Sequence, residues 1–224
     1  MKLIVTLDIS LKCPAMCIYS REFALWHIFA FSCQKKKNDF NWCSSNVQVK
    51  LLPYLKDIKR DEEKQICIAR CLMDEIQLLF LKYKIENKNQ VLIVFEGYVF
   101  SIGKSFGNHK LHEITGLVRC EIYRAGFYNI KTVHPKTWQS FIGKKVTKQD
   151  TVLHIEKNGP CLNFITLLNL KQCKKKGKVL NPAEGLADAC GIMLYVLHEF
   201  EENGDVTLGA DNDADDEGTD DMDD

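Results

Sequence analysis

The sequence predicts an α/β fold in which a mixed five-stranded sheet is flanked by helices on both faces. Short apolar and β-branched segments alternate along the chain with longer segments whose apolar residues recur every three to four positions. Three strands come first, then helix, strand, helix, strand, and finally a group of helices, an order typical of a layered α/β domain. With 224 residues, 46% of them apolar, the chain is long enough to bury one core.

Three strands are expected near the N-terminus. Residues 3–7 are apolar and β-branched, and residues 16–19 and 23–32 predict two further short strands. The polar segment Ser20-Arg21-Glu22 between them is typical of a hairpin turn. Consecutive strands with short connections are expected to pair antiparallel. Residues 34–46 are expected to form a loose connection.

The following segments alternate between helix and strand. Residues 61–84 predict a helix, because acids in its first turn stabilise the positive end and apolar residues form one face. Residues 91–95 form an unbroken apolar run, which is typical of a buried central strand. The remaining expected elements are a helix over residues 109–125, a strand over residues 130–133, a short helix opened by Pro135, a helix capped by Thr147 that reaches Lys157, and a last helix from Asn181-Pro182 to about Phe200.

The formal net charge of zero conceals a strong asymmetry along the chain. Residues 201–224 hold 12 acids and no Lys or Arg, so residues 1–200 carry 18 acids against 30 bases, a net charge of +12. Because the acidic segment has almost no apolar surface to bury, we expect residues 1–200 to form the folded domain and residues 201–224 a disordered tail. A basic folded body favours a polyphosphate partner such as nucleic acid.

The ten cysteines are scattered, with no Cys-x-x-Cys pair and no cluster at zinc-ligand spacing. We therefore expect neither a zinc site nor a disulfide scaffold, and a reducing, intracellular location. No apolar run approaches the length of a membrane span and no secretory signal is visible, so no membrane association is expected.

Three acidic residues stand next to apolar segments, where an unpaired charge is costly. Asp8 ends the first expected strand, Glu96 directly follows the apolar run 91–95, and Asp188 lies early in the last helix. Taken singly, each fits an ordinary role as a turn acid, a strand-end charge or a solvated helix residue. In the expected strand order the first and fourth strands are neighbours, so Asp8 and Glu96 would meet at one edge of the sheet.

Such a group of carboxylates calls for a positive partner. Two carboxylates ~4 Å apart repel by about 4 kcal/mol at an effective dielectric constant near 20. An all-oxygen ligand set favours Mg²⁺, for which Mn²⁺ can substitute. Two such ions ~3.5–4 Å apart can stabilise both the attacking water and the leaving oxygen of a phosphodiester.

The order of elements matches the ribonuclease H-like architecture, and four segments resemble the motifs of RuvC-type Holliday junction resolvases. Residues 8–15 (DISLKCPA) resemble the first-strand motif, and their Lys-x-Pro-Ala part is most similar to the poxvirus branch and its mitochondrial relatives. Residues 95–100 (FEGYVF) resemble the second motif, residues 133–148 the basic third segment, and residues 184–189 (EGLADA) the acid pair of the final helix. The resemblance covers about residues 1–198.

The resemblance implies an Mg²⁺-dependent endonuclease that resolves four-way and branched DNA junctions, with two ions in each active site. The implied metal ligands are Asp8, Glu96, Glu184 and Asp188. The family's late acids are usually three residues apart, whereas Glu184 and Asp188 are four apart and Gly185 stands where the fourth acid is expected. Positions i and i+4 share a helix face, so both acids can reach one site; Glu184 also fits as a favourable charge in the first helical turn.

The third segment also implies catalytic and DNA-binding cations. In the resembled family a lysine of this segment lies near the scissile phosphate, and Lys148 or Lys144 fits that role, with Lys148 the expected catalytic residue. Basic and aromatic residues near the motifs predict the DNA contacts; alternatively, the lysines form a solvated face and the aromatics belong to the core. The predicted contacts are Lys12, Tyr98, Phe100, Lys104, Lys110, Lys136, Lys144, Lys145 and Lys148. His134 fits either a phosphate contact or a structural role.

The resemblance further implies a homodimer with the helix 109–125 at its interface. The apolar stripe Leu111, Ile114, Leu117 and Val118 suits that role, and it suits packing on the sheet equally well. No small-molecule cofactor is expected. A viral origin would place the protein in the cytoplasm of an infected host cell, and a mitochondrial location is the alternative. Two other functions stay open: another ribonuclease H-like nuclease, acting on RNA–DNA hybrids or in DNA packaging, and a non-catalytic DNA-binding or assembly module.

Overall fold

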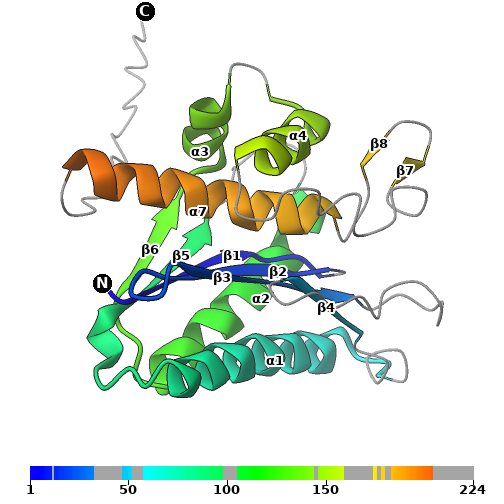
Figure 1. Ribbon diagram of the computed structural model, residues 1–224. Coiled ribbons are helices and arrows are strands. Elements are labelled where there is room, and N and C mark those ends of the chain that lie inside the picture. Colours follow the sequence, from blue (N-terminus) through cyan, green and yellow to red (C-terminus); the bar gives the residue numbers. More distant parts are fainter. Residues whose placement is uncertain are drawn as a thin grey trace, which may run out of the picture.

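The computed structural model describes residues 1–11, 13–32, 47–51, 58–97, 105–143, 146–158, 174–175, 178–179 and 183–203 (Figure 1). The strands are β1 (Leu3–Asp8), β2 (Ala15–Ser20), β3 (Leu25–Ser32), β4 (Val47–Leu51), β5 (Val91–Glu96), β6 (Ile130–Val133), β7 (Lys174–Lys175) and β8 (Lys178–Val179). The helices are α1 (Asp61–Lys82), α2 (Ser105–Arg124), α3 (Pro135–Ile142), α4 (Lys148–Asn158) and α7 (Ala183–Asn203), with a 3₁₀ turn at Lys88–Gln90.

The central sheet is mixed and has the order β4-β3-β2-β1-β5-β6. β1, β2 and β3 pair antiparallel, whereas β5 runs parallel to β1, and β6 parallel to β5. This confirms the ribonuclease H-like α/β class and the expected neighbourhood of the first and fourth predicted strands. The predicted number of strands is corrected, because β4 pairs in parallel with β3 and extends the sheet to six strands. The alternation Val47-Gln48-Val49-Lys50-Leu51 is a strand signal that the sequence prediction missed.

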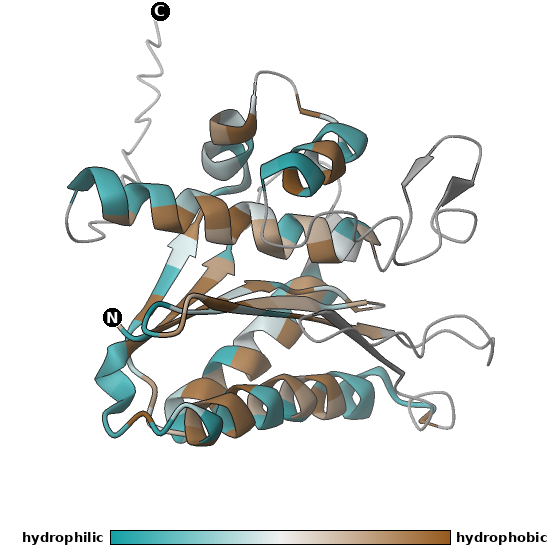
Figure 2. Cartoon of the chain, viewed as in Figure 1, coloured by the Kyte–Doolittle hydropathy of each residue, from teal (hydrophilic) through white to brown (hydrophobic). Residues whose placement is uncertain are grey.

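Helices cover both faces of the sheet. α1 and α2 lie on one face, and α7 crosses the other face with α3 and α4 outside it (Figure 1). Side chains alternate along β1, so Leu3, Val5 and Leu7 enter the core shared with α1 and α2, while Ile4 enters the core shared with α7. The central strands and the middle of α7 are mainly hydrophobic, and the C-terminal end of α7 is hydrophilic (Figure 2).

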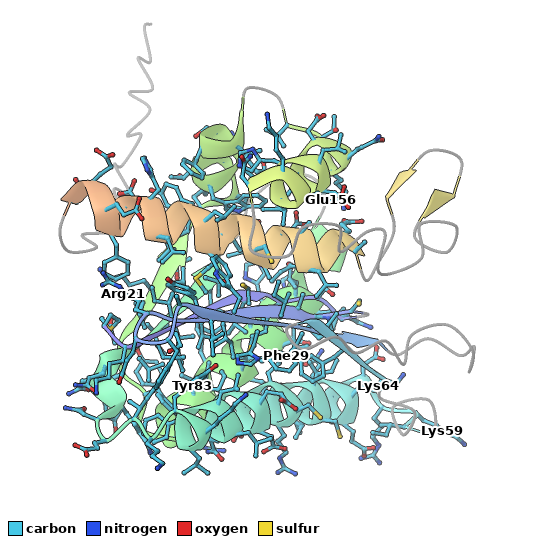
Figure 3. All side chains as sticks on the ribbon, viewed as in Figure 1. Arg21, Phe29, Lys59, Lys64, Tyr83 and Glu156 are labelled. Atoms are coloured by element: carbon cyan, nitrogen blue, oxygen red, sulfur yellow. The ribbon has the colours of Figure 1, made fainter. Side chains whose placement is uncertain are left out.

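Two polar contacts in the described residues add to the apolar packing of α7, one to β1 and one to the turn that follows β2. The buried hydroxyl of Thr6 donates a hydrogen bond to the carbonyl oxygen of Ala189, at 2.7 Å. At the other end of the helix, the guanidinium of Arg21 lies 5.2 Å from the ring centre of Phe200 (Figure 3). Thr6 precedes Asp8 by two residues and Ala189 directly follows Asp188, so the first contact fixes β1 against α7 beside two of the predicted site residues.

We expect Thr6→Val to lower the free energy of unfolding by about 1 kcal/mol, because the near-isosteric side chain keeps the packing and loses the hydrogen bond to Ala189. Urea unfolding of the two proteins measures the difference. Unfolding midpoints that coincide at equal slopes would show that this hydrogen bond does not stabilise the contact between β1 and α7.

Most predicted helix boundaries lie within a few residues of the observed ones. The helix predicted to start at residue 109 begins at Ser105. The last helix continues to Asn203, so the first three residues of the predicted tail are helical; residues 204–224 lie outside the described part of the chain. None of the helices in the described residues combines the length and apolar character that a membrane span requires.

Candidate active site

The four predicted metal ligands lie on elements that meet at one edge of the sheet. Asp8 is the last residue of β1 and Glu96 the last residue of β5, and these parallel strands are neighbours. The alternation that sends Leu7 and Phe95 into the α1–α2 core places Asp8 and Glu96 on the opposite face, beneath α7. Glu184 and Asp188 lie in the first two turns of α7.

Gly185 permits a close approach between α7 and the ends of β1 and β2. A β-carbon at this position would lie 3.2 Å from Oδ2 of Asp8, 3.2 Å from the carbonyl oxygen of Cys13 and 3.3 Å from Cβ of Ala15. Any side chain here would press on the Asp8 carboxylate. The position where the resembled family carries an acid is therefore filled by the helix backbone, directly against Asp8.

The carboxylates of Asp8, Glu96 and Asp188 share one electrostatic environment. Burial raises the pKa of Asp8 well above its ordinary value, and repulsion from Asp188 and then Glu96 raises it further, against the opposing effect of Lys148. Burial, followed by repulsion from Glu96, raises the pKa of Asp188 to about 7. Burial also raises the pKa of Glu96. These acids are costly to ionise together, so the site favours a bound positive charge.

Lys148 supplies a positive charge to this cluster. It is the first residue of α4, and its ammonium contacts Oε1 of Glu184 while its side chain stays 66% exposed. A capping box fixes this end of the helix: the Thr147 N–H donates to Oδ2 of Asp150 at 2.9 Å, and the Asp150 N–H donates to Oγ1 of Thr147 at 3.3 Å. Lys148 also lowers the pKa of Asp8, Glu96 and Asp188, against the effect of burial.

The donor set fits a hard divalent cation, because its four members are all carboxylates carried by strands and helices. Within the described residues, no three His, Cys, Asp or Glu side chains converge closely enough to surround one ion in this arrangement. An ion bound here would require the carboxylates to turn toward one point. Asp8, Glu96, Asp188 and Glu184 are the residues that would hold it.

Trp138 in α3 belongs to the site although the sequence analysis did not select it. Its indole N–H donates a hydrogen bond to Oε1 of Glu96 at 3.0 Å, and the side chain is fully buried. This bond lowers the pKa of Glu96, against the larger effect of burial. The contact spans 42 positions of sequence, and nothing in the sequence around the tryptophan indicates its partner.

Some of the predicted DNA-binding residues belong to the described part of the chain, and the others lie outside it. The exposed Lys136 lies in the first turn of α3, and Lys110 forms an ion pair with Asp61 at the start of α1. His134 caps α3 by accepting a hydrogen bond from the Lys136 N–H at 3.2 Å, which is the structural role. The predicted contacts that lie outside the described residues are Lys12, Tyr98, Phe100, Lys104, Lys144 and Lys145.

The apolar stripe of α2 packs within the chain. Ile114 and Val118 are buried in the core shared with α1 and the sheet, and Leu111 and Leu117 pack against it. Of the two roles open for this stripe, packing on the sheet is therefore the observed one. The homodimer stays a prediction, and the stripe does not support it.

No protein-family model and no curated protein matches the sequence. The structure is similar to Thermus thermophilus RuvC, with a TM-score of 0.46 and 11% identity over 90% of this chain and 96% of that one. It is also similar to T. thermophilus RuvC in complex with a Holliday junction substrate (TM-score 0.45, 11% identity, 89% and 95% covered). A third similar structure is the yeast mitochondrial Holliday junction resolvase Ydc2 (TM-score 0.44, 12% identity, 90% and 81% covered). At such low identity, the chemistry of the site must be judged from its own side chains.

Proposed function

We propose that this protein is a metal-dependent endonuclease that cleaves branched DNA, chiefly four-way junctions. One observation carries the proposal: Asp8, Glu96 and Asp188 come from three separate elements and lie at one edge of the sheet, where Asp188 and Glu96 raise the pKa of Asp8 and Glu96 raises that of Asp188. Such a group of buried acids does not stabilise a fold, because an apolar cluster of the same size would make the free energy of folding more favourable. The arrangement suits the binding of divalent cations.

The side chains then have distinct roles. Asp8, Glu96 and Asp188, together with Glu184, would hold two Mg²⁺ or Mn²⁺ ions. When bound, such ions act as Lewis acids on a phosphodiester and on the attacking water. Lys148, whose side chain is largely exposed beside Glu184, would donate to a non-bridging oxygen of the scissile phosphate and offset the charge that develops there. Hydrolysis would leave a 5′-phosphate and a 3′-hydroxyl.

The substrate class follows from charge and from the sequence motifs. Residues 1–200 carry a net charge of +12, which attracts a polyphosphate. The preference for junctions rests on the four motifs that resemble RuvC-type resolvases, and recognition would depend on DNA shape and phosphate contacts. A homodimer would present two sites related by a two-fold axis to the two strands that must be cut. Location in the host cytoplasm or in a mitochondrion stays a prediction.

A non-catalytic DNA-binding module is the second candidate. It is favoured by the glycine at the position where a fourth acid is expected. Gly185 occupies the place where the resembled family carries an acid, and the nearby Glu184 contacts Lys148. In such a module the lysine would neutralise the acids permanently, and DNA would bind without being cut.

A substrate panel with a metal titration tests these alternatives. The full-length protein is incubated with a four-way junction, a flap, an RNA–DNA hybrid and a linear duplex over a range of Mg²⁺ concentrations. We expect the junction to be cleaved at least tenfold faster than the linear duplex, and no cleavage in EDTA. Faster cleavage of the hybrid would indicate a different ribonuclease H-like nuclease. Junction binding without cleavage at any Mg²⁺ or Mn²⁺ concentration would indicate the binding module.

A further inference from the structure

We propose that Trp138 is a positioning residue that fixes the Glu96 carboxylate in one orientation, so that the neighbouring carboxylates turn toward it when a divalent cation binds. The inference rests on the proposed function and adds to it a residue outside the carboxylate set. Its basis is the hydrogen bond from the indole N–H to Oε1 of Glu96, at 3.0 Å, made by a fully buried side chain.

The indole is held in place by α7. A β-carbon at Gly191 would lie only 2.7 Å from Cζ3 and 3.0 Å from Cε3 of Trp138, so the six-membered ring rests against the helix backbone where a side chain is missing. The ring is fully buried in the α7-side core, where close packing restricts its rotation. The direction of its N–H is therefore set by packing.

A fixed donor is useful to a glutamate in this position. Glu96 ends a strand, and its three side-chain torsions would otherwise let the carboxylate take several orientations. The indole binds one oxygen and leaves Oε2 for a cation. Because an indole is a neutral donor with no acceptor atom, it can neither bind the cation itself nor replace it, unlike the ammonium of Lys148.

The same ring also sets the position of Glu96 relative to Asp188. Gly191, on which the indole rests, lies three residues after Asp188, about one turn along α7. One rigid side chain thus contacts both the strand-end acid and the helix that carries the other acid. Hydrogen-bond partners of metal ligands contribute about 10–100-fold to metal affinity in comparable sites.

Manganese binding to the full-length protein tests the inference, with Mn²⁺ alone as the probe in isothermal titration calorimetry. Two substitutions at Trp138 are compared: Trp138→Phe, and an isosteric replacement by 3-benzothienylalanine, in which sulfur takes the place of the N–H. Trp26→Phe is the matched control, because Trp26 packs against the same core and its ring contact is with Tyr19. Thermal unfolding of each variant measures the structural cost.

We expect both Trp138 variants to bind Mn²⁺ about 10–100-fold more weakly than the wild type. The isosteric variant should unfold within a few degrees of the wild type, and the control should keep wild-type affinity. Junction cleavage by the isosteric variant should fall strongly at limiting Mn²⁺ and recover toward the wild-type rate at saturating Mn²⁺. Wild-type affinity in the isosteric variant would overturn the inference and leave the proposed function intact. A wild-type protein that neither binds Mn²⁺ nor cleaves junctions would overturn both.

Discussion

The Asp8→Asn protein is expected to bind four-way junctions with wild-type affinity and to cleave them about a thousandfold more slowly. Asp8 lies where β1, β5 and the start of α7 meet, and its carboxylate interacts with both Glu96 and Asp188. The amide keeps the shape and removes the negative charge that a divalent cation needs. Losing several kcal/mol of transition-state stabilisation corresponds to about three orders of magnitude in rate.

Asp74→Asn is the matched control for this experiment. Asp74 is an exposed acid of α1, on the face of the sheet opposite α7, and its replacement changes the net charge by the same amount. Since DNA affinity depends on charge and on salt, both variants are compared with the wild type at one ionic strength. Single-turnover cleavage and a filter-binding assay in EDTA measure rate and affinity. Cleavage by Asp8→Asn at the wild-type rate would remove Asp8 from the mechanism.

The meeting of Asp8 and Glu96 was predictable because two simple periodicities determine it. The two-residue alternation of a strand fixes the face on which each acid lies, and the order of three strands, a helix and a strand makes β1 and β5 neighbours. The acids end their strands at nearly the same level of the sheet, since Leu7 pairs with Phe95. The sequence therefore predicts both the face of the sheet and the edge of the sheet at which the two acids lie.

The contacts that complete the site could not be predicted in this way. The hydrogen bond from Trp138 to Glu96 and the contact of the indole with Gly191 depend on how α3 packs outside α7. No periodicity of apolar residues in the sequence specifies that packing. Lys148 is an intermediate case. A cation at the first position of a helix is electrostatically unfavourable, so its presence there indicates a role other than helix stability.

In metal-free buffer, Asp188→Asn is expected to be more stable than the wild type at pH 8, and this advantage should shrink as the pH falls. In the folded protein the pKa of Asp188 is raised to about 7, mainly by burial and then by repulsion from Glu96. An unfolded chain restores the ordinary acidic value. Between the two values the native state binds more protons than the unfolded state, so wild-type stability rises as pH decreases, by about 1 kcal/mol for each pH unit. The variant lacks the contribution of Asp188 to this dependence and keeps those of Asp8 and Glu96.

Taking the difference between the two proteins removes the titrating groups that do not interact with Asp188. Asp8 does not cancel: repulsion from Asp188 raises its pKa in the wild type only, so its contribution to the difference has the same sign as that of Asp188. The pKa of His27 is lowered by burial and by Lys82, so its protonation opposes folding as the pH falls below its ordinary value; this effect is common to both proteins and cancels. Urea unfolding in EDTA at pH 5, 6, 7 and 8 measures the difference in the free energy of unfolding. A difference that does not vary with pH would contradict a raised pKa for Asp188.

Repeating the series in Mg²⁺ tests whether the same carboxylates bind the cation. A bound cation favours the ionised carboxylates, so Mg²⁺ should stabilise the wild type most at pH 8, where the metal-free protein is weakest, and stabilise Asp188→Asn much less.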